Sequence, residues 1–342
     1  MYLKSCVIYF QMTTNEVVVK IPFKPKINTE DKPMSMYNYG NTCFFNTALQ
    51  VITSSSRFMS TISKMEKSDK IICNFSSIAN LNKTADLSDV HKKLWIELRN
   101  KYPGYSLGMQ QDCHECLIFF IDLIDEILKK PIQLSRNQRK ISLGKDYSEI
   151  MRSFGAFWWD EYTYRMDPLV KNFHGMYHSS TTCDSCKVEN NKWELFNNIS
   201  LNTSHKNFKD WSDTFSKNEK IEGYGCEKCK KSQTATRKIE VWRFPKTLIL
   251  HTINKSLSKI STELFVSETL HKSCKYEMKG VGFHTGPNIN CGHYYCCINK
   301  NSKWWIISDE NIQGPLDIYK ELPSHIKNTY IILYERTHKQ ES

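Results

Sequence analysis

The 342-residue sequence lacks any hydrophobic run long enough to cross a membrane, since a spanning helix needs about 20 consecutive apolar residues. Its apolar start, MYLKSCVIYF, is short for a secretory signal and is followed by a polar segment. Internal repeats and extended low-complexity tracts are also absent. We therefore expect a globular, intracellular protein of the cytoplasm or nucleus that does not bind a membrane.

The cysteines do not form an evident disulfide framework. There are 13 of them, an odd number, and four have the spacing of metal ligands. Disulfide-rich domains are usually short secreted chains with an even number of cysteines. A reducing compartment suits this composition, in agreement with the expected intracellular location.

Positive charge exceeds negative charge by 11 at pH 7. Lysine and arginine are concentrated in residues 129–140 and 228–231. No helix-turn-helix, RNA-recognition box or regular zinc-finger spacing accompanies them, and such runs are usually solvated surfaces. We therefore expect no specific nucleic-acid partner, although the charge is consistent with a general attraction to acidic partners.

Cys43 lies in the run NYGNTCFFNTALQVI, at the start of a predicted helix. Four apolar residues there have the i, i+3, i+4, i+7 spacing of one helix face: Phe45, Ala48, Leu49 and Ile52. A cysteine in the first turn of a helix meets unpaired backbone N–H groups and the positive end of the dipole, so we expect a lowered pKa. Asn38 and the backbone N–H of Cys43 are candidate donors to an oxyanion. A buried cysteine in an amphipathic helix explains this run equally well.

His293 opens a predicted β-hairpin in which two runs of aromatic and β-branched residues flank a turn at Asn299–Lys303. If the turn is symmetric about Asn301, His293 lies opposite Asp309, and a slip of one residue places Ser308 there instead. A general base needs an acceptor on its second ring nitrogen to fix its tautomer. One of these two residues is therefore expected to orient His293, although a histidine after a glycine is more often an ordinary turn residue.

Two CxxC pairs predict a metal site. Their two-residue gaps allow both sulfurs of each pair to reach one ion: Cys183, Cys186, Cys226 and Cys229. One tetrahedral Zn²⁺ is the specific prediction. Because protein ligands fill all four positions, we expect the zinc to be structural and to clamp the tip of a ribbon of strands.

The motifs resemble those of the ubiquitin-specific proteases, papain-like cysteine peptidases that cleave after the C-terminal glycine of ubiquitin. Four blocks occur in the expected order: NYGNTCFFNTALQ at 38–50, QQDCHECLIFFIDLI at 110–124, the double CxxC, and the GHYY hairpin followed by YIILYER at 330–336. Agreement of four ordered blocks by chance is very improbable. The resemblance covers about residues 34–336.

The resemblance implies an α+β, papain-like fold with a helical thumb, a β-rich palm and zinc-ribbon fingers. The expected organisation is an N-terminal extension at 1–33, a catalytic domain at 34–336 and a tail at 337–342. Within the catalytic domain, we expect the thumb at about 34–165, the fingers at about 176–240, and the palm in the remaining β-rich part. A monomer is expected.

The resemblance also implies a thiol-dependent deubiquitinase whose partners are ubiquitin and ubiquitinated proteins. His293 would deprotonate Cys43, which would form a thioester while Asn38 stabilises the oxyanion. Ser308 stands where the family has an aspartate or asparagine that orients the histidine. Because a hydroxyl is a weaker acceptor, and because of the symmetric-turn argument, we prefer Asp309 for that role.

Substrate-binding residues are likewise implied by the resemblance. Acidic residues at Asp112 and Glu115 would hold the arginine-bearing tail of ubiquitin through charge-assisted hydrogen bonds, and Asp112 also suits a helix N-terminus. The further expected substrate contacts are Gln111, His284, Gly292 and Tyr294.

Two alternatives from other functional classes remain open. A weakened third catalytic position is consistent with a pseudo-enzyme that binds ubiquitin with little turnover. The basic charge and the CxxC pairs are consistent with a zinc-ribbon protein that binds nucleic acid.

Overall fold

The computed structural model describes residues 32–65, 69–79, 87–105, 108–131, 146–253, 257–268, 273–288 and 291–337. The chain divides into two units, Met1–Lys32 and Pro33–Ser342. Nearly all of the expected N-terminal extension and tail lie outside the described residues, so those boundaries stay predictions. The fold described below is that of the second unit, in which no described helix is long and apolar enough to cross a membrane.

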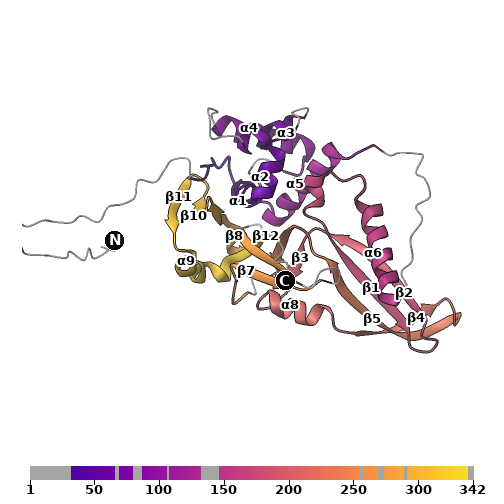
Figure 1. Ribbon diagram of the computed structural model, residues 1–342. Coiled ribbons are helices and arrows are strands. Elements are labelled where there is room, and N and C mark those ends of the chain that lie inside the picture. The colour runs from indigo at the N-terminus through magenta and orange to yellow at the C-terminus, as the bar shows by residue number, and fades with distance from the viewer. Residues whose placement is uncertain are drawn as a thin grey trace, which may run out of the picture. The chain divides into compact units, whose positions relative to one another are not determined.

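Helices dominate the first part of this unit (Figure 1). They are α1 (Cys43–Thr53), α2 (Ser56–Ile62), α3 (Lys70–Ala79), α4 (Leu87–Lys101), α5 (Cys113–Leu128), α6 (Tyr147–Thr163) and α7 (Pro168–Lys171). Side-chain oxygens at the N-caps stabilise several of them, for example Ser55 for α2, Asp112 for α5 and Asp146 for α6. All residues of α1 from Cys43 to Ile52 are buried, which explains why this helix carries no charged side chain.

A large sheet forms the second layer, with strand order β11-β10-β9-β8-β12-β6-β3 and β7 paired to β8. Its strands are β3 (Ile199–Leu201), β6 (Thr247–Thr252), β7 (Glu263–Val266), β8 (Cys274–Asn288), β9 (Cys291–Lys300), β10 (Lys303–Ser308), β11 (Asn311–Leu316) and β12 (Thr329–Arg336). Strands β3 and β6 are parallel, and the other pairs are antiparallel.

Both faces of the large sheet are buried. Along β12, Ile331 and Leu333 join the core beneath the N-terminal helices, whereas Ile332 and Tyr334 join a second core. That second core includes residues of α8 (Phe208–Phe215) and α9 (Ile318–His325), which is followed by the 3₁₀ helix η3 (Ile326–Asn328). Successive side chains of a strand point to opposite faces of the sheet. Because both faces of β12 are buried, most of its positions carry apolar residues.

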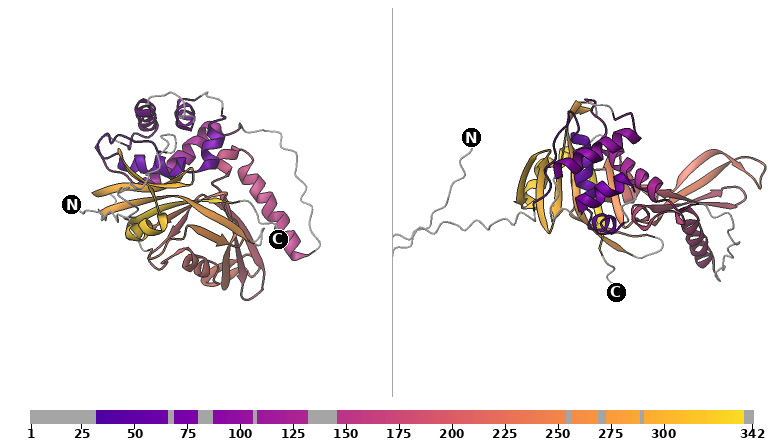
Figure 2. Two further views of the ribbon diagram at one scale, coloured as in Figure 1. Left: turned by 60° about the vertical axis from the view of Figure 1, so that its left-hand side comes forward. Right: turned by 90° about the horizontal axis from the view of Figure 1, so that it is seen from above.

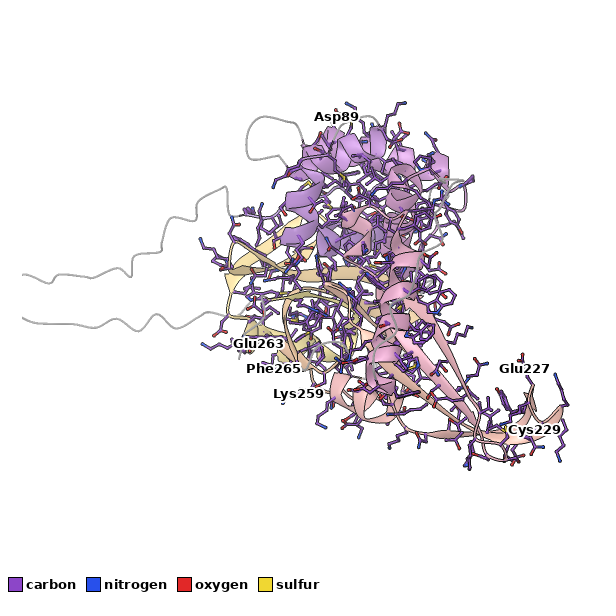
Figure 3. All side chains as sticks on the ribbon, turned by 45° about the vertical axis from the view of Figure 1, so that its right-hand side comes forward. Asp89, Glu227, Cys229, Lys259, Glu263 and Phe265 are labelled. Atoms are coloured by element: carbon purple, nitrogen blue, oxygen red, sulfur yellow. The ribbon has the colours of Figure 1, made fainter. Side chains whose placement is uncertain are left out.

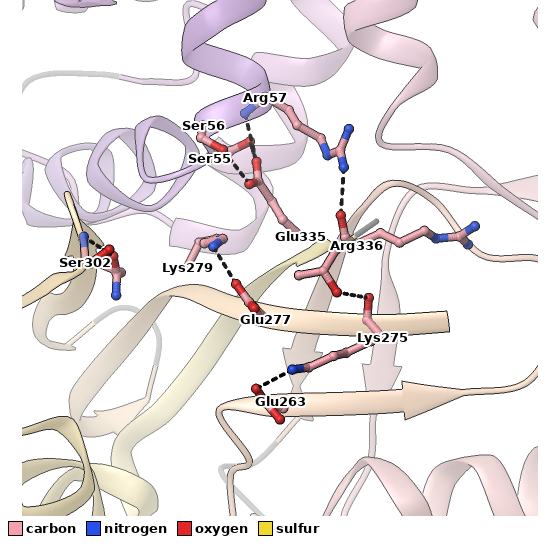
Figure 4. Close-up of polar contacts among 12 residues, drawn as sticks. Ser55, Ser56, Arg57, Glu263, Lys275, Glu277, Lys279, Ser302, Glu335 and Arg336 are labelled. Carbon is pink, nitrogen blue, oxygen red and sulfur yellow. Dashed lines mark hydrogen bonds and ion pairs between the residues drawn. The ribbon is translucent and has the colours of Figure 1, made fainter. Parts of the chain in front are cut away.

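Glu335 ties the helical layer to the sheet (Figure 4). Its carboxylate accepts hydrogen bonds from Ser55 and from the backbone N–H of Arg57 at the start of α2. The carboxylate also accepts one from the Ser56 hydroxyl at 2.8 Å. Because Glu335 is only 4% exposed, these donors replace the water that a buried carboxylate would otherwise need.

A smaller antiparallel sheet has the order β2-β1-β5-β4. Its strands are β1 (Gly175–Cys183), β2 (Glu189–Phe196), β4 (Glu219–Cys226) and β5 (Lys231–Arg243). Helix α6 runs alongside this sheet (Figure 2), where Trp159 shares a core with Trp193 and Trp242. The ends of β1 and β4 carry two of the four predicted metal ligands, Cys183 and Cys226.

Candidate active site

Cys43 is the first residue of α1, as the sequence predicts. The preceding turn is organised by Asn38, whose Oδ1 accepts hydrogen bonds from the backbone N–H groups of Gly40 at 3.1 Å and Thr42 at 2.9 Å. Gly40 has a φ of +93° and Asn41 one of +58°, so this turn uses the left-handed region that glycine and asparagine tolerate best. The turn therefore places Asn38 and the Cys43 sulfur at the same helix end.

The pKa of the Cys43 thiol is raised, not lowered as the helix position alone suggests. Burial is the largest cause, and the carboxylate of Asp309 acts in the same direction. The backbone N–H groups of Tyr294 and Phe44 and the side-chain amide of Gln110 lower the pKa but do not offset burial. Cys43 therefore rests as a thiol, and its activation requires transfer of the proton to a base.

The β9–β10 hairpin has a different register from the predicted one. Lys300 pairs with Lys303, leaving a two-residue turn at Asn301 and Ser302, which both have positive φ. The turn is thus symmetric about the peptide between those residues instead of about Asn301. A shift of one residue exchanges the two faces of a strand, so it moves Asp309 away from the face that carries His293.

Ser308 is the residue that contacts the imidazole. Its Oγ lies 2.8 Å from Nε2 of His293. The predicted placement of Asp309 opposite His293 is wrong, because the register of the hairpin differs by one residue from the predicted one. Nδ1 of His293 lies on the other side of the ring, so contact with Ser308 leaves this nitrogen for proton transfer.

Asp309 instead joins two asparagines. Its φ of +53° turns the chain at the end of β10, and its carboxylate oxygens accept from Asn38 Nδ2 at 2.9 Å and Asn46 Nδ2 at 2.7 Å. An amide NH₂ group has two hydrogens. One hydrogen of Asn38 is therefore used to orient the group, and the second is available to an oxyanion.

His91 of α4 completes this network. Its Nε2 lies 2.8 Å from Oδ1 of Asn46, and its ring is 1% exposed and stacks on Tyr39 and Phe45. Burial lowers the pKa of His91 to about 4. Because the Asp309 carboxylate only accepts, the Asn46 NH₂ must face it and the Asn46 oxygen must accept from a neutral, Nε2-protonated His91.

Gln110 is a further site residue, although the motif that contains it predicts no role for it. Its Nε2 donates to the carbonyl of Gly292 at 2.8 Å, and the Gly292 N–H donates to Oε1 at 3.1 Å. The same Nε2 lies 3.8 Å from the Cys43 sulfur. Gln110 thus links three segments that are distant in sequence. The predicted substrate residue beside it, Gln111, donates to the carbonyl of Gly104 at 3.3 Å.

The acidic residues predicted to bind substrate occupy different depths. Asp112 caps α5, as expected, by accepting from the N–H groups of His114 and Glu115. Its second oxygen accepts from the hydroxyl of Tyr330. Glu115 is exposed, whereas Asp112 is only partly exposed.

His284 and Tyr294 are each 1% exposed, with ring centroids 4.3 Å apart. They lie behind Gly292, where an added Cβ would come within 2.5 Å of His284 Nε2 and 2.1 Å of a backbone oxygen. Gly292 is therefore needed for close packing of this strand. These two aromatic residues are a supporting layer, whereas Gly292 itself is exposed.

The four predicted metal ligands converge at the tip of the small sheet, where Figure 3 labels Cys229. Their sulfurs all lie within 4.8 Å of one another, including Cys183–Cys229 at 3.9 Å and Cys186–Cys226 at 3.5 Å. Zn–S bonds of about 2.3 Å in a tetrahedron separate sulfurs by roughly 3.8 Å. The cluster fits one metal ion, and within the described ranges it is the only such group.

Comparison with known proteins identifies relatives along most of the chain. The family model described as ubiquitin carboxyl-terminal hydrolase matches residues 34–334. Ubiquitin carboxyl-terminal hydrolase Usp2 of Drosophila melanogaster is 25% identical in an alignment of 333 positions, which covers 88% of this chain and 34% of that protein. Ubiquitin carboxyl-terminal hydrolase 25 of Arabidopsis thaliana is 24% identical in an alignment of 342 positions, which includes gaps and covers 90% of this chain and 48% of that protein. The chain thus spans about a third to a half of these relatives.

Solved structures with a similar fold cover most of the chain. The SAGA Ubp8/Sgf11/Sus1/Sgf73 DUB module bound to ubiquitin aldehyde contains a chain similar to this one, with a TM-score of 0.67 and 17% identity, covering 91% of this chain and 71% of that one. A yeast SAGA DUB module with a mutant Sgf73 matches with a TM-score of 0.69 and 19% identity, covering 92% of this chain and 71% of that one. These likenesses confirm the expected α+β fold.

Proposed function

This chain belongs to the ubiquitin carboxyl-terminal hydrolase family, and we propose that it hydrolyses the bond after the C-terminal glycine of ubiquitin through a thioester on Cys43. The observation that carries this proposal is the linkage of Cys43 to both neighbours of His293. Gln110 connects the Cys43 sulfur to Gly292, and the backbone N–H of Tyr294 acts on the same sulfur. The chain segment that bears the imidazole is therefore held beside the thiol.

The reaction begins with transfer of the Cys43 proton to His293, because burial keeps the resting group a thiol. The thiolate attacks the glycine carbonyl, and the oxyanion receives hydrogen bonds from the second Asn38 N–H and the Cys43 backbone N–H. The lysine amine leaves with the proton held by His293. Water, deprotonated by the same imidazole, then hydrolyses the thioester and releases ubiquitin.

Ser308 and Asp309 orient different residues in this mechanism. Ser308 fixes the ring orientation of His293 through their 2.8 Å contact. Asp309 fixes the amide of Asn38 and is itself held by Asn46. Neither residue has to exchange a proton with the substrate.

The cysteine cluster would hold one structural Zn²⁺ through Cys183, Cys186, Cys226 and Cys229. Bound there, the ion would supply a cross-link between the ends of β1 and β4 and no reactive site, because four protein ligands complete its coordination. The chain's own contribution is the two knuckle turns, in which Lys187 and Lys230 adopt positive φ.

The substrate would be ubiquitin joined to proteins, in keeping with the relatives' names and with ubiquitin aldehyde in a structurally similar complex. Glu115 and Asp112 are the proposed partners of the basic ubiquitin tail, together with Gln111 and the surface around Gly292. A cytoplasmic or nuclear monomer remains the proposed state of the protein.

The test is hydrolysis of ubiquitin carrying a fluorogenic C-terminal amide. The proposal predicts steady release by the wild-type chain and none by Cys43→Ala, which should still bind ubiquitin. Equal release by both proteins would refute it.

A ubiquitin-binding pseudo-enzyme is the second candidate, which the uncharged acceptor Ser308 favours. In that case both the wild-type chain and Cys43→Ala would bind ubiquitin, and neither would release the fluorophore.

A further inference from the structure

A pocket of about 90 Å³ lies between α6, α7 and the junction of β5 with β6. It shares no residue with the site around Cys43. A single buried water needs only roughly 10–15 Å³ of such space, so the pocket can hold a small polyatomic ion with some of its water. Its wall includes Trp159, Lys171, His174, Arg243 and Lys246.

Positive charge dominates the lining. Lys171, Arg243 and Lys246 contribute three cations, and none of the lining residues is acidic. Burial is the largest cause of the lowered pKa of all three groups, and neighbouring cations act in the same direction: Arg57 and Arg243 on Lys246, and Arg243 on Lys171. Cations that repel one another are stabilised electrostatically when an anion binds between them.

The nearest carboxylates do not neutralise these cations by direct contact. Glu268 is committed to Arg336, with an N–O distance of 2.9 Å. Glu268 and, to a smaller extent, Asp160 raise the pKa of Arg243, and Asp160 also raises that of Lys171. In the described part of the chain, no carboxylate forms an ion pair with Lys171, Arg243 or Lys246.

Trp159 orders two of the cations without using their hydrogen-bond donors. Its ring centroid lies 4.3 Å from Cζ of Arg243 and 5.3 Å from Nζ of Lys171, which is the geometry of cation–π contacts. A guanidinium held by its face keeps its N–H fork in the plane of the group. The Arg243 side chain makes no hydrogen bond among the described residues, so this fork remains for a ligand.

We propose that this pocket binds a phosphate-type oxyanion, held by Arg243, Lys171 and Lys246. Tetrahedral oxygens suit both the two-pronged donor of arginine and the point charges of lysine. The bound ion would join α7, which carries Lys171, to the β5–β6 junction, which carries the other two residues. The ligand is either free phosphate or a phosphate monoester, and the site is independent of the proposed peptidase chemistry.

The experiment is calorimetric titration of the full chain with inorganic phosphate at constant ionic strength, with chloride as the reference anion. The variants are Arg243→Gln and Lys246→Gln. Lys259→Gln is the matched control, because Lys259, labelled in Figure 3, is exposed and does not line the pocket. Lys246 is only partly buried and its side chain is largely exposed, so we expect its substitution to leave the fold intact even if Arg243→Gln does not.

The expected result is saturable binding of phosphate by the wild-type chain and by Lys259→Gln. Affinity should fall about tenfold in Lys246→Gln and further in Arg243→Gln, the scale of a lost hydrogen bond to a charged group. A parallel titration with O-phosphoserine distinguishes the sources: tighter binding of O-phosphoserine than of inorganic phosphate indicates a phosphate monoester, whereas binding of inorganic phosphate alone indicates the free ion. Phosphate binding no stronger than that of chloride, or equal binding by Lys246→Gln and Lys259→Gln, would overturn the proposal.

Discussion

Nε2 of His293 lies 2.8 Å from Oγ of Ser308, on the neighbouring strand of the same hairpin. The imidazole is therefore oriented by an uncharged hydroxyl. Asp309, one residue further along, serves Asn38 instead. These two consecutive residues thus support different parts of the proposed reaction, the base and the oxyanion donor, and can be tested separately.

Replacement of Ser308 by alanine should lower kcat for ubiquitin amide hydrolysis about tenfold, since a neutral hydrogen bond that orients the base is lost. KM should change little because Ser308 is not expected to touch ubiquitin. Ser308→Thr keeps the hydroxyl and is the matched control. Steady-state kinetics of the three proteins test this prediction. An unchanged kcat in Ser308→Ala would show that the hydrogen bond between Ser308 and His293 does not contribute to catalysis.

Replacement of Asp309 by alanine should lower kcat more than Ser308→Ala does, by roughly 100-fold, which is the effect of removing an oxyanion donor. The reason is that Asn38 and Asn46 both lose their acceptor. A double-mutant cycle supplies the control: if Asp309 acts through Asn38, then Asn38→Ala/Asp309→Ala is no slower than Asn38→Ala. Fully additive losses would contradict this link.

His91→Leu should lower kcat about tenfold at unchanged ubiquitin affinity, because the buried Asn46 oxygen loses its donor. His91→Gln can still donate and should restore part of the activity. If both variants behave alike, His91 has a packing role only.

The same histidine gives a pH dependence of stability. With a folded pKa of about 4 against an ordinary 6.5, His91 binds a proton more readily in the unfolded chain. Its contribution to stability is therefore complete above pH 6.5 and is lost as pH falls toward 4, by an amount on the order of 3 kcal/mol. Urea unfolding of wild type and His91→Gln between pH 4 and 7 should show a shallower decline in the variant.

Removal of one ligand should empty the metal site. Wild-type protein is expected to contain one zinc per chain by elemental analysis, and Cys226→Ala none. The melting temperature should fall, since metal binding is coupled to the folding of its ligand turns. Zinc-free wild-type protein with unchanged stability would contradict the structural role. Lys217→Ala, on an exposed residue outside the cluster, controls for substitution in this region.

Local sequence patterns predict the parts of the site that depend on local structure. Periodicity places Cys43 in the first turn of a helix, and CxxC spacing identifies the four converging cysteines. The hairpin register cannot be obtained in this way, because it depends on whether the turn is centred on Asn301 or on the peptide between Asn301 and Ser302. Asn301 and Ser302 both adopt positive φ, a conformation that neither residue type requires.

Tertiary contacts lie beyond the sequence pattern. His91 and Asn46 are 45 residues apart and meet only when α4 packs on α1. Asn46 does carry a signal, since an amide on an otherwise buried helix needs a partner, but nothing in the sequence names that partner. The raised pKa of Cys43 differs from the prediction for a related reason: the helix end is local, whereas the burial that outweighs it comes from the whole fold.

The most direct measurement is reaction of the full chain with ubiquitin bearing a C-terminal electrophile, followed by peptide mapping. We expect one covalent adduct per chain, on the sulfur of Cys43, and none in Cys43→Ala. No adduct at all, or an adduct that persists in Cys43→Ala on another cysteine, would contradict the assignment of Cys43 as the nucleophile.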